Sequence, residues 1–191
     1  MKVSAHSMLL AFWMGVAHCQ AAPQPTPATP APASLQAMSK AVLEEKSPAQ
    51  QRLLGQFAEQ NREQLSGVLA RLALGYAAFQ EKKYTEAIQQ FEAARKAPSL
   101  LVDYADYYEA VSEVALGNHA DAVTLLDGFA ARYPSSPLAP KAVFQLAQSL
   151  LALRRPGDAA ALLDSSSVAL PQPDGTLLLG RAYQSDNRLA D

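Results

Sequence analysis

The residue types best suited to chemistry gather in one short stretch, DYADYYEAVSE, which spans Asp103–Glu113. If this stretch is helical, its tyrosines fall on two adjacent stripes and its aspartates stand in the first turns. Such a wall of rings and carboxylates could stack on a sugar or grip a peptide, with Asp103, Tyr104, Asp106, Tyr107 and Tyr108 as its candidate residues. The alternative, which we favour, is that the tyrosines fill grooves between helices while the aspartates interact favourably with the helix dipole.

Two pairs of glutamates have the composition that acid–base catalysis requires, Glu44 with Glu45 and Glu109 with Glu113. Catalysis by two carboxylates needs one acid kept protonated by burial and an ionised partner across a cleft. Each pair lies within a single expected helix, and we interpret Glu109 and Glu113 as a solvated helix edge. We therefore expect no catalytic residue, and no enzymatic activity, in this chain.

The remaining polar candidates have simpler interpretations. His119 falls in an expected turn, where we interpret it as a packed turn residue rather than a base. The serines lack the glycine and histidine context of a nucleophile; they are Ser135, Ser136 and Ser165 to Ser167. Cys19 is the only cysteine and the three histidines are scattered, so we expect neither a metal site nor a cofactor.

Composition limits the class of protein further. The 191 residues carry a net charge of −2 with both signs interspersed, whereas a nucleic-acid-binding protein would show a basic stripe. No apolar run reaches the ~18 residues of a membrane-spanning helix. We expect one domain, no nucleic-acid partner and no transmembrane span.

The N-terminus is typical of an export signal. Lys2 precedes the apolar stretch MLLAFWMGVA, and small residues allow cleavage after Ala17 or Ala21. We predict a signal peptide over residues 1–21, a Pro/Ala-rich linker over 22–34, and a periplasmic or exported protein; the alternative is a first helix buried in the core. Lipid attachment at Cys19 is not expected, because His18 stands where a lipobox has a small residue.

From Leu35 onward, apolar residues recur at three- and four-residue spacings, which predicts an all-α fold. Three alanines, Ala87, Ala122 and Ala159, lie 35 and 37 residues apart. A small residue stands twelve positions before each alanine and a large apolar residue four positions after it. These flanking residues are Gly75, Ala110 and Ala147 on the N-terminal side, and Phe91, Leu126 and Leu163 on the C-terminal side.

The spacing has a physical reason. Two antiparallel helices cross closely only where both carry small residues, so Gly75 should face Ala87, and Phe91 should fill the groove before the next hairpin. Pro98, Pro134 and Pro171 should end the second helices. We predict N-terminal helices over residues 35–66 and an α-solenoid of helix hairpins over 67–191, with three hairpins and an incomplete fourth.

The fourth hairpin is expected to be incomplete because Gly180 occupies the small-residue register and Leu189 opens a second helix. The next packed alanine would fall at position 192. We therefore expect the sequence to be the N-terminal piece of a longer protein; the alternative is a short scaffold whose last helix is covered by a partner.

The stretch EKKYTEAIQQFEAARKAP resembles the tetratricopeptide family, with Tyr84, Ala87, Phe91 and Ala94 in its second-helix pattern. Four segments between Val68 and Asp191 are also similar, in order, to the N-terminal helical region of soluble lytic transglycosylases: VLARLALGYAAFQEKKYTEAI, LVDYADYYEAVSEVALG, GFAARYPSSPLAPKA and LLLGRAYQSDNRLAD. This resemblance implies a periplasmic protein in which a superhelix precedes a C-terminal lysozyme-like domain that cleaves peptidoglycan non-hydrolytically.

The sequence departs from that family at its chemistry, because the family's catalytic Glu-Ser dipeptide is absent. The resemblance therefore implies a non-catalytic arm, whose partners are a C-terminal catalytic domain and peptidoglycan. Residues 128–153 also resemble the repeats of envelope assembly lipoproteins and cell-division coordinators, which implies a scaffold that binds a protein partner.

Overall fold

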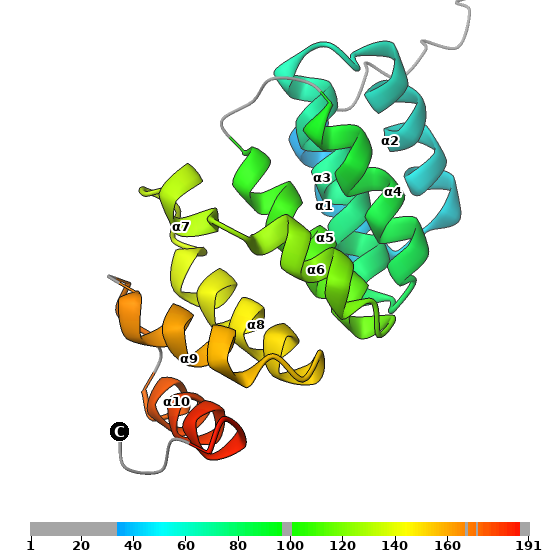
Figure 1. Cartoon of the computed structure of the whole chain (residues 1–191). Helices are drawn as coiled ribbons and strands as arrows, with labels where there is room; N and C mark the ends of the chain where they lie inside the picture. The colour runs from blue at the N-terminus through cyan, green and yellow to red at the C-terminus, as the bar shows by residue number, and fades with distance from the viewer. Residues whose placement is uncertain (1–33, 97–100, 167, 171, 188–191) are drawn as a thin grey trace, which may run out of the picture. The chain divides into compact units, whose positions relative to one another are not determined.

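The computed structural model describes residues 34–96, 101–166, 168–170 and 172–187, all of which fold as helices and short connections without a strand (Figure 1). These residues belong to one unit, Ala33–Asp191. The all-α prediction is confirmed for them. The predicted signal peptide, almost all of the predicted linker and Cys19 lie outside the described residues. No helix in the described ranges is both long enough and apolar enough to cross a membrane.

The helices follow one another with short connections. Their bounds are α1 Leu35–Glu45, α2 Pro48–Gln60, α3 Leu65–Gln80, α4 Tyr84–Arg95, α5 Val102–Ala115, α6 His119–Leu126, α7 Phe129–Arg132, α8 Ala139–Ala152, α9 Pro156–Ser165 and α10 Asp174–Ser185. Local side-chain chemistry explains where two of these helices begin. Ser34 caps α1 by accepting a hydrogen bond from the amide of Ala37 at 3.2 Å. Pro48 begins α2 at the position where its missing amide hydrogen removes no helical bond.

Most helices pack mainly on their neighbours in the chain, so the fold is a series of hairpins: α1 with α2, α3 with α4, α5 with α6, and α8 with α9; α1 also packs on α3. Successive hairpins are in contact through α2 and α3, α4 and α5, and α6 and α8, while α10 packs on α8 and α9. The buried apolar residues that the structure describes form three successive clusters along the chain rather than a single centre.

The repeated small residues lie at these contacts. Ala87, Ala110, Ala122, Ala147 and Ala159 are fully buried, and Leu126 and Leu163 are buried beside them. Gly75 meets Phe91: a Cβ atom on Gly75 would lie 2.6 Å from Cε1 of that ring. Gly180 differs, since it is exposed and a Cβ atom there would meet nothing within 4 Å. The helix expected to cover Gly180 is predicted from Leu189 onward, and those residues lie outside the described ones.

The prediction that prolines end the second helices is wrong for two repeats. Helix α6 ends at Leu126, well before Pro134, because Gly128 adopts a left-handed conformation with φ 64° and the chain restarts as α7. Helix α9 ends at Ser165, whose hydroxyl donates a hydrogen bond to the carbonyl of Ala161 at 2.7 Å. Serine side chains that bond the backbone in this way compete with helix propagation.

Two glycines of these helices and turns should respond oppositely to alanine. Gly55 lies inside α2 with no atom within 4 Å of an added Cβ, so Gly55→Ala should raise the free energy of unfolding by about 0.5–1 kcal/mol. Gly128→Ala should lower it by about 1 kcal/mol, because a Cβ atom disfavours positive φ even where space is open. Urea unfolding of the two variants checks this, and a loss of stability in both would contradict it.

Candidate functional site

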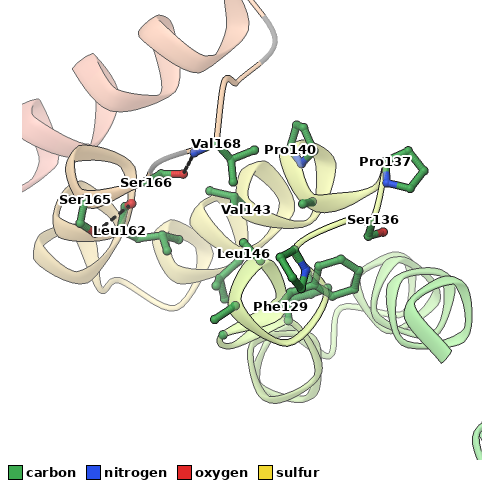
Figure 2. A pocket seen from close by; sticks show the side chains of 16 residues that line it. Phe129, Ser136, Pro137, Pro140, Val143, Leu146, Leu162, Ser165, Ser166 and Val168 are labelled. Atoms are coloured by element: carbon green, nitrogen blue, oxygen red, sulfur yellow. Dashed lines mark hydrogen bonds between the residues drawn. The ribbon is translucent and has the colours of Figure 1, made fainter. Parts of the chain in front are cut away.

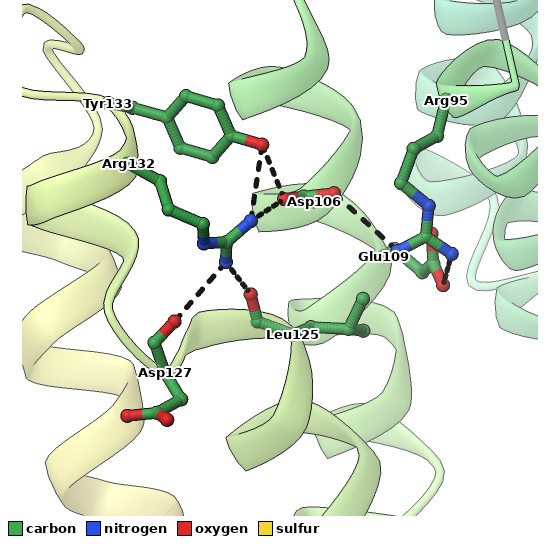
Figure 3. A network of polar contacts seen from close by, with 7 residues as sticks. All are labelled: Arg95, Asp106, Glu109, Leu125, Asp127, Arg132 and Tyr133. Carbon is green, nitrogen blue, oxygen red and sulfur yellow. Dashed lines mark hydrogen bonds and ion pairs between the residues drawn. The ribbon is translucent and has the colours of Figure 1, made fainter.

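The most elaborate polar site of the described residues is a buried network centred on Asp106 of α5 (Figure 3). The Asp106 side chain is only 3% exposed. Arg132, at the end of α7, places Nη1 2.7 Å from its Oδ2, and the Tyr133 hydroxyl donates to the same oxygen at 2.8 Å. Arg95, at the end of α4, lies 3.5 Å from Oδ1. The network therefore ties α5 to the segments on either side of it.

Arg132 also holds the break between α6 and α7. Its Nη2 donates to the carbonyl of Leu125 at 2.5 Å and to that of Asp127 at 3.4 Å. The last carbonyls of a helix have no partner within it, so a guanidinium at this place satisfies them. The guanidinium also lies 5.0 Å from the centre of the Tyr133 ring. Burial, reinforced by the bond to Asp106, raises the pKa of the Tyr133 hydroxyl, which keeps it a donor.

Asp103 is fixed by the turn that precedes α8. Its Oδ2 accepts a hydrogen bond of 2.6 Å from the Ser136 hydroxyl, which itself accepts from the amide of Leu138 at 3.2 Å. Asp103 and Asp106 are 7% and 2% exposed. The structure thus places both aspartates inside the fold, paired with other segments, rather than on the candidate sugar- or peptide-binding surface, which is not the interpretation that we favour.

The interpretation of Glu109 and Glu113 as a solvated helix edge is wrong for Glu109. It is only 4% exposed, and its Oε1 lies 3.1 Å from Nη2 of Arg95. Burial raises its pKa to about 7, while Arg95 opposes the shift. Glu113 is half-buried and accepts a 2.7 Å hydrogen bond from the Asn118 side chain. The two glutamates therefore occupy different environments, because only Glu109 faces the end of α4.

The predicted tyrosines lie half-buried on α5. The Tyr108 ring is central to an aromatic cluster, with ring centres 5.2 Å from Tyr76, 5.3 Å from Tyr107, 5.6 Å from Phe79 and 6.0 Å from Phe91. Tyr104 packs at the edge of the core formed by the later helices. Each of the three tyrosines is partly buried and leaves part of its surface to solvent.

A groove of about 650 Å³ lies at α7, α8 and α9 (Figure 2). Of the described residues that line it none is ionisable, and the larger ones are Leu126, Phe129, Pro134, Pro137, Pro140, Val143, Leu146, Leu162 and Val168. The hydroxyl of Ser165 is engaged by the carbonyl of Ala161, and that of Ser166 accepts from the amide of Val168 at 3.2 Å. The groove therefore presents mainly apolar surface.

The other candidate residues from the sequence make no hydrogen bond or ion pair with the Asp106 network in the described part of the chain. Glu44 and Glu45 are exposed on α1, where Glu44 lies 3.9 Å from Lys40. His119 begins α6, half-buried, and its Nδ1 has no hydrogen-bond partner among the described residues. Within those residues no three side chains of the metal-binding types form a group that could hold an ion.

The family model of the tetratricopeptide repeat matches residues 45–100 and 107–172, which is more than half of the chain. The chain belongs to the tetratricopeptide-repeat family. Two solved structures are similar, both of a putative kinesin light chain with nearly identical TPR-like repeats from Podosopora anserina. One has a TM-score of 0.62 and 17% identity, covering 83% of this chain and 90% of that one; the other, a variant, has 0.62 and 18%, covering 82% and 88%. At these identities the likeness shows the fold, a tetratricopeptide-like solenoid. No curated protein matches the sequence.

Within this tetratricopeptide-repeat protein, the network joins consecutive hairpins, because its partners come from α4, α5 and α7. Sequence reasoning missed Arg95, Arg132 and Tyr133 as its members, and Ser136 as the partner of Asp103. The available signal was the spacing of Asp103, Asp106 and Glu109, which places three carboxylates on one face of a helix. That spacing alone does not distinguish a buried face from a solvated one.

Proposed function

We propose that this chain is a non-catalytic tetratricopeptide scaffold that binds a protein partner, as the N-terminal arm of an exported lytic transglycosylase-like protein acting on peptidoglycan. Tetratricopeptide domains bind protein partners, and family membership is the observation that carries the scaffold role. The buried carboxylates support it too, since Asp103, Asp106 and Glu109 are paired with side chains of other helices or turns, and none of the three lines the groove.

The proposals that the chain is a transglycosylase-like arm and that it is exported are based on the sequence. Four segments follow the order of the helical region in soluble lytic transglycosylases, and residues 1–21 have the pattern of a signal peptide. In this proposal, the chemistry belongs to a lysozyme-like domain encoded beyond position 191, and the arm shapes the surface on which that domain and peptidoglycan meet.

The alternative is a stand-alone scaffold for envelope assembly or cell division. The groove favours it, because residues 128–153, which resemble the repeats of such scaffolds, form much of its lining. An uncharged groove of this size suits an apolar segment of a partner protein.

Sequencing the gene beyond codon 191 tests whether the chain is the N-terminal arm of a longer protein. We expect the reading frame to continue through further hairpins to a lysozyme-like region that contains a Glu-Ser dipeptide. A stop codon there would contradict the arm and leave the stand-alone scaffold.

Photo-crosslinking of the full chain to envelope proteins tests the groove as a partner site. A photoreactive residue at the exposed Pro137, on the rim, should give a protein adduct, whereas the same residue at the exposed Glu44 of α1 should not. Adducts at both positions, or at neither, would contradict binding in the groove.

A further inference from the structure

Helix α5 carries more buried carboxylates than there are arginines paired with them. Three carboxylates, those of Asp103, Asp106 and Glu109, are each less than a tenth exposed. Among the described residues, the cations paired with them are Arg95 and Arg132. Of these carboxylates, Arg132 bonds Asp106 alone. Arg95 lies near two carboxylates, 3.5 Å from Asp106 and 3.1 Å from Glu109.

Glu109 shares its cation partner, Arg95, with Asp106. Its Oε2 is buried without a hydrogen-bond partner among the described residues. From α4 it faces Arg95 and Glu92, and from α5 it faces Asp106 and Glu113, so acids outnumber bases around it. A buried anion with an unsatisfied oxygen is costly, and a proton on that oxygen removes the charge.

We propose that Glu109 acts as a proton-sensitive lock between the α3/α4 and α5/α6 hairpins, closed when it is protonated and loosened when it is ionised. With a proton on Glu109, Arg95 needs to neutralise only Asp106, and the excess charge disappears. Without that proton, Glu109 and Asp106 compete for the same guanidinium. The lock depends on these contacts alone and does not depend on the proposed function.

The lock extends toward the groove through Asp106. This carboxylate bonds Arg95 on one oxygen and Arg132 on the other, and Arg132 holds the carbonyls where α6 ends. Helix α7 then contributes Phe129, Ala130 and Ala131 to the groove. If the Arg95 contacts loosen, Asp106 holds Arg132 less firmly, and the α7 side of the groove is less restrained.

The sign of the pH effect follows from which state holds the proton. The pKa of Glu109 is about 7 in the folded chain against an ordinary value of 4.5, so between these values the folded state binds more protons than the unfolded state. The stabilisation is fully present below the unfolded value and is lost as pH rises through 7. Wild-type protein should therefore be more stable in mild acid than in mild alkali.

Urea unfolding of the full chain at about pH 5.5 and about pH 8 tests the lock. We expect the unfolding constant of the wild type to be roughly thirtyfold larger at the higher pH, because between about pH 5.5 and 7 the folded state holds close to one more proton than the unfolded state, and each pH unit is then worth a factor of ten. In Glu109→Gln, which mimics the protonated state, at least half of that difference should vanish, and stability at the higher pH should equal or exceed that of the wild type. The control is Glu86→Gln, the same charge change at an exposed residue of α4, which should keep the wild-type difference.

A wild-type pH difference that persists in Glu109→Gln would overturn the lock. A second measurement is independent of any variant's folding: a ¹³C NMR titration of the Glu109 side-chain carboxyl in the wild type. A midpoint above about pH 6 supports the lock, and one near the ordinary value of 4.5 overturns it.

Discussion

Replacing Arg132 with alanine is expected to lower the free energy of unfolding by about 3 kcal/mol, because removal of one partner leaves a buried charge uncompensated. The Asp106 side chain, 3% exposed, would lose its 2.7 Å contact and keep only the Tyr133 hydroxyl and the longer contact to Arg95. The carbonyls of Leu125 and Asp127 would lose a donor as well. Urea unfolding at neutral pH measures the loss.

The matched control for that variant is Arg155→Ala. Arg155 also makes a short contact, 2.6 Å to Asp158, but both side chains are more than half exposed. Exposed pairs of this kind contribute about 0.5 kcal/mol or less, so Arg155→Ala should change little. A double variant, Arg132→Ala with Asp106→Ala, should recover part of the loss, since no buried charge is then left without its partner. Equal effects of the two arginine variants would contradict a buried role for Arg132.

The packing could be read from the sequence because it depends on local spacing. Ala122 and Ala159 are fully buried, as expected where helices cross closely, since helical periodicity places residues at fixed intervals on one face. The same rule fails for Gly180, which has the right position in the sequence but no described helix against it. Periodicity identifies a face, and only the neighbouring helix determines whether that face is covered.

The polar network could not be predicted in the same way. Asp106 meets Arg132 across 26 positions and Asp103 meets Ser136 across 33, so the partners are adjacent only after the hairpins have packed. Their contact also needs the break after α6, which turns Arg132 back toward α5. The dipeptide Asp127-Gly128 is a common turn signal that would have indicated this break, had it been given more weight than Pro134.

Replacing Phe91 with alanine should lower the free energy of unfolding by about 4 kcal/mol, the range typical of a large ring removed from a core. Phe91 is 1% exposed, and its ring lies over Gly75 of α3 and 6.0 Å from the ring of Tyr108 on α5. Its loss would empty the contact between two hairpins. Leu177→Ala, at a residue that is 62% exposed on α10, is the control and should shift stability by no more than about 0.5 kcal/mol.

The contact between Phe91 and Gly75 can be isolated by combining two substitutions. In the wild type, Gly75→Ala should lower stability by about 2 kcal/mol, because the new Cβ atom would lie 2.6 Å from a ring that has little room to move. In the Phe91→Ala background the ring is gone, and the same change should instead raise stability by up to about 1 kcal/mol through helix propensity. This reversal of sign distinguishes a steric contact from a general preference for glycine in α3. If Gly75→Ala lowered stability equally in both backgrounds, Phe91 would not be the reason that the position is glycine.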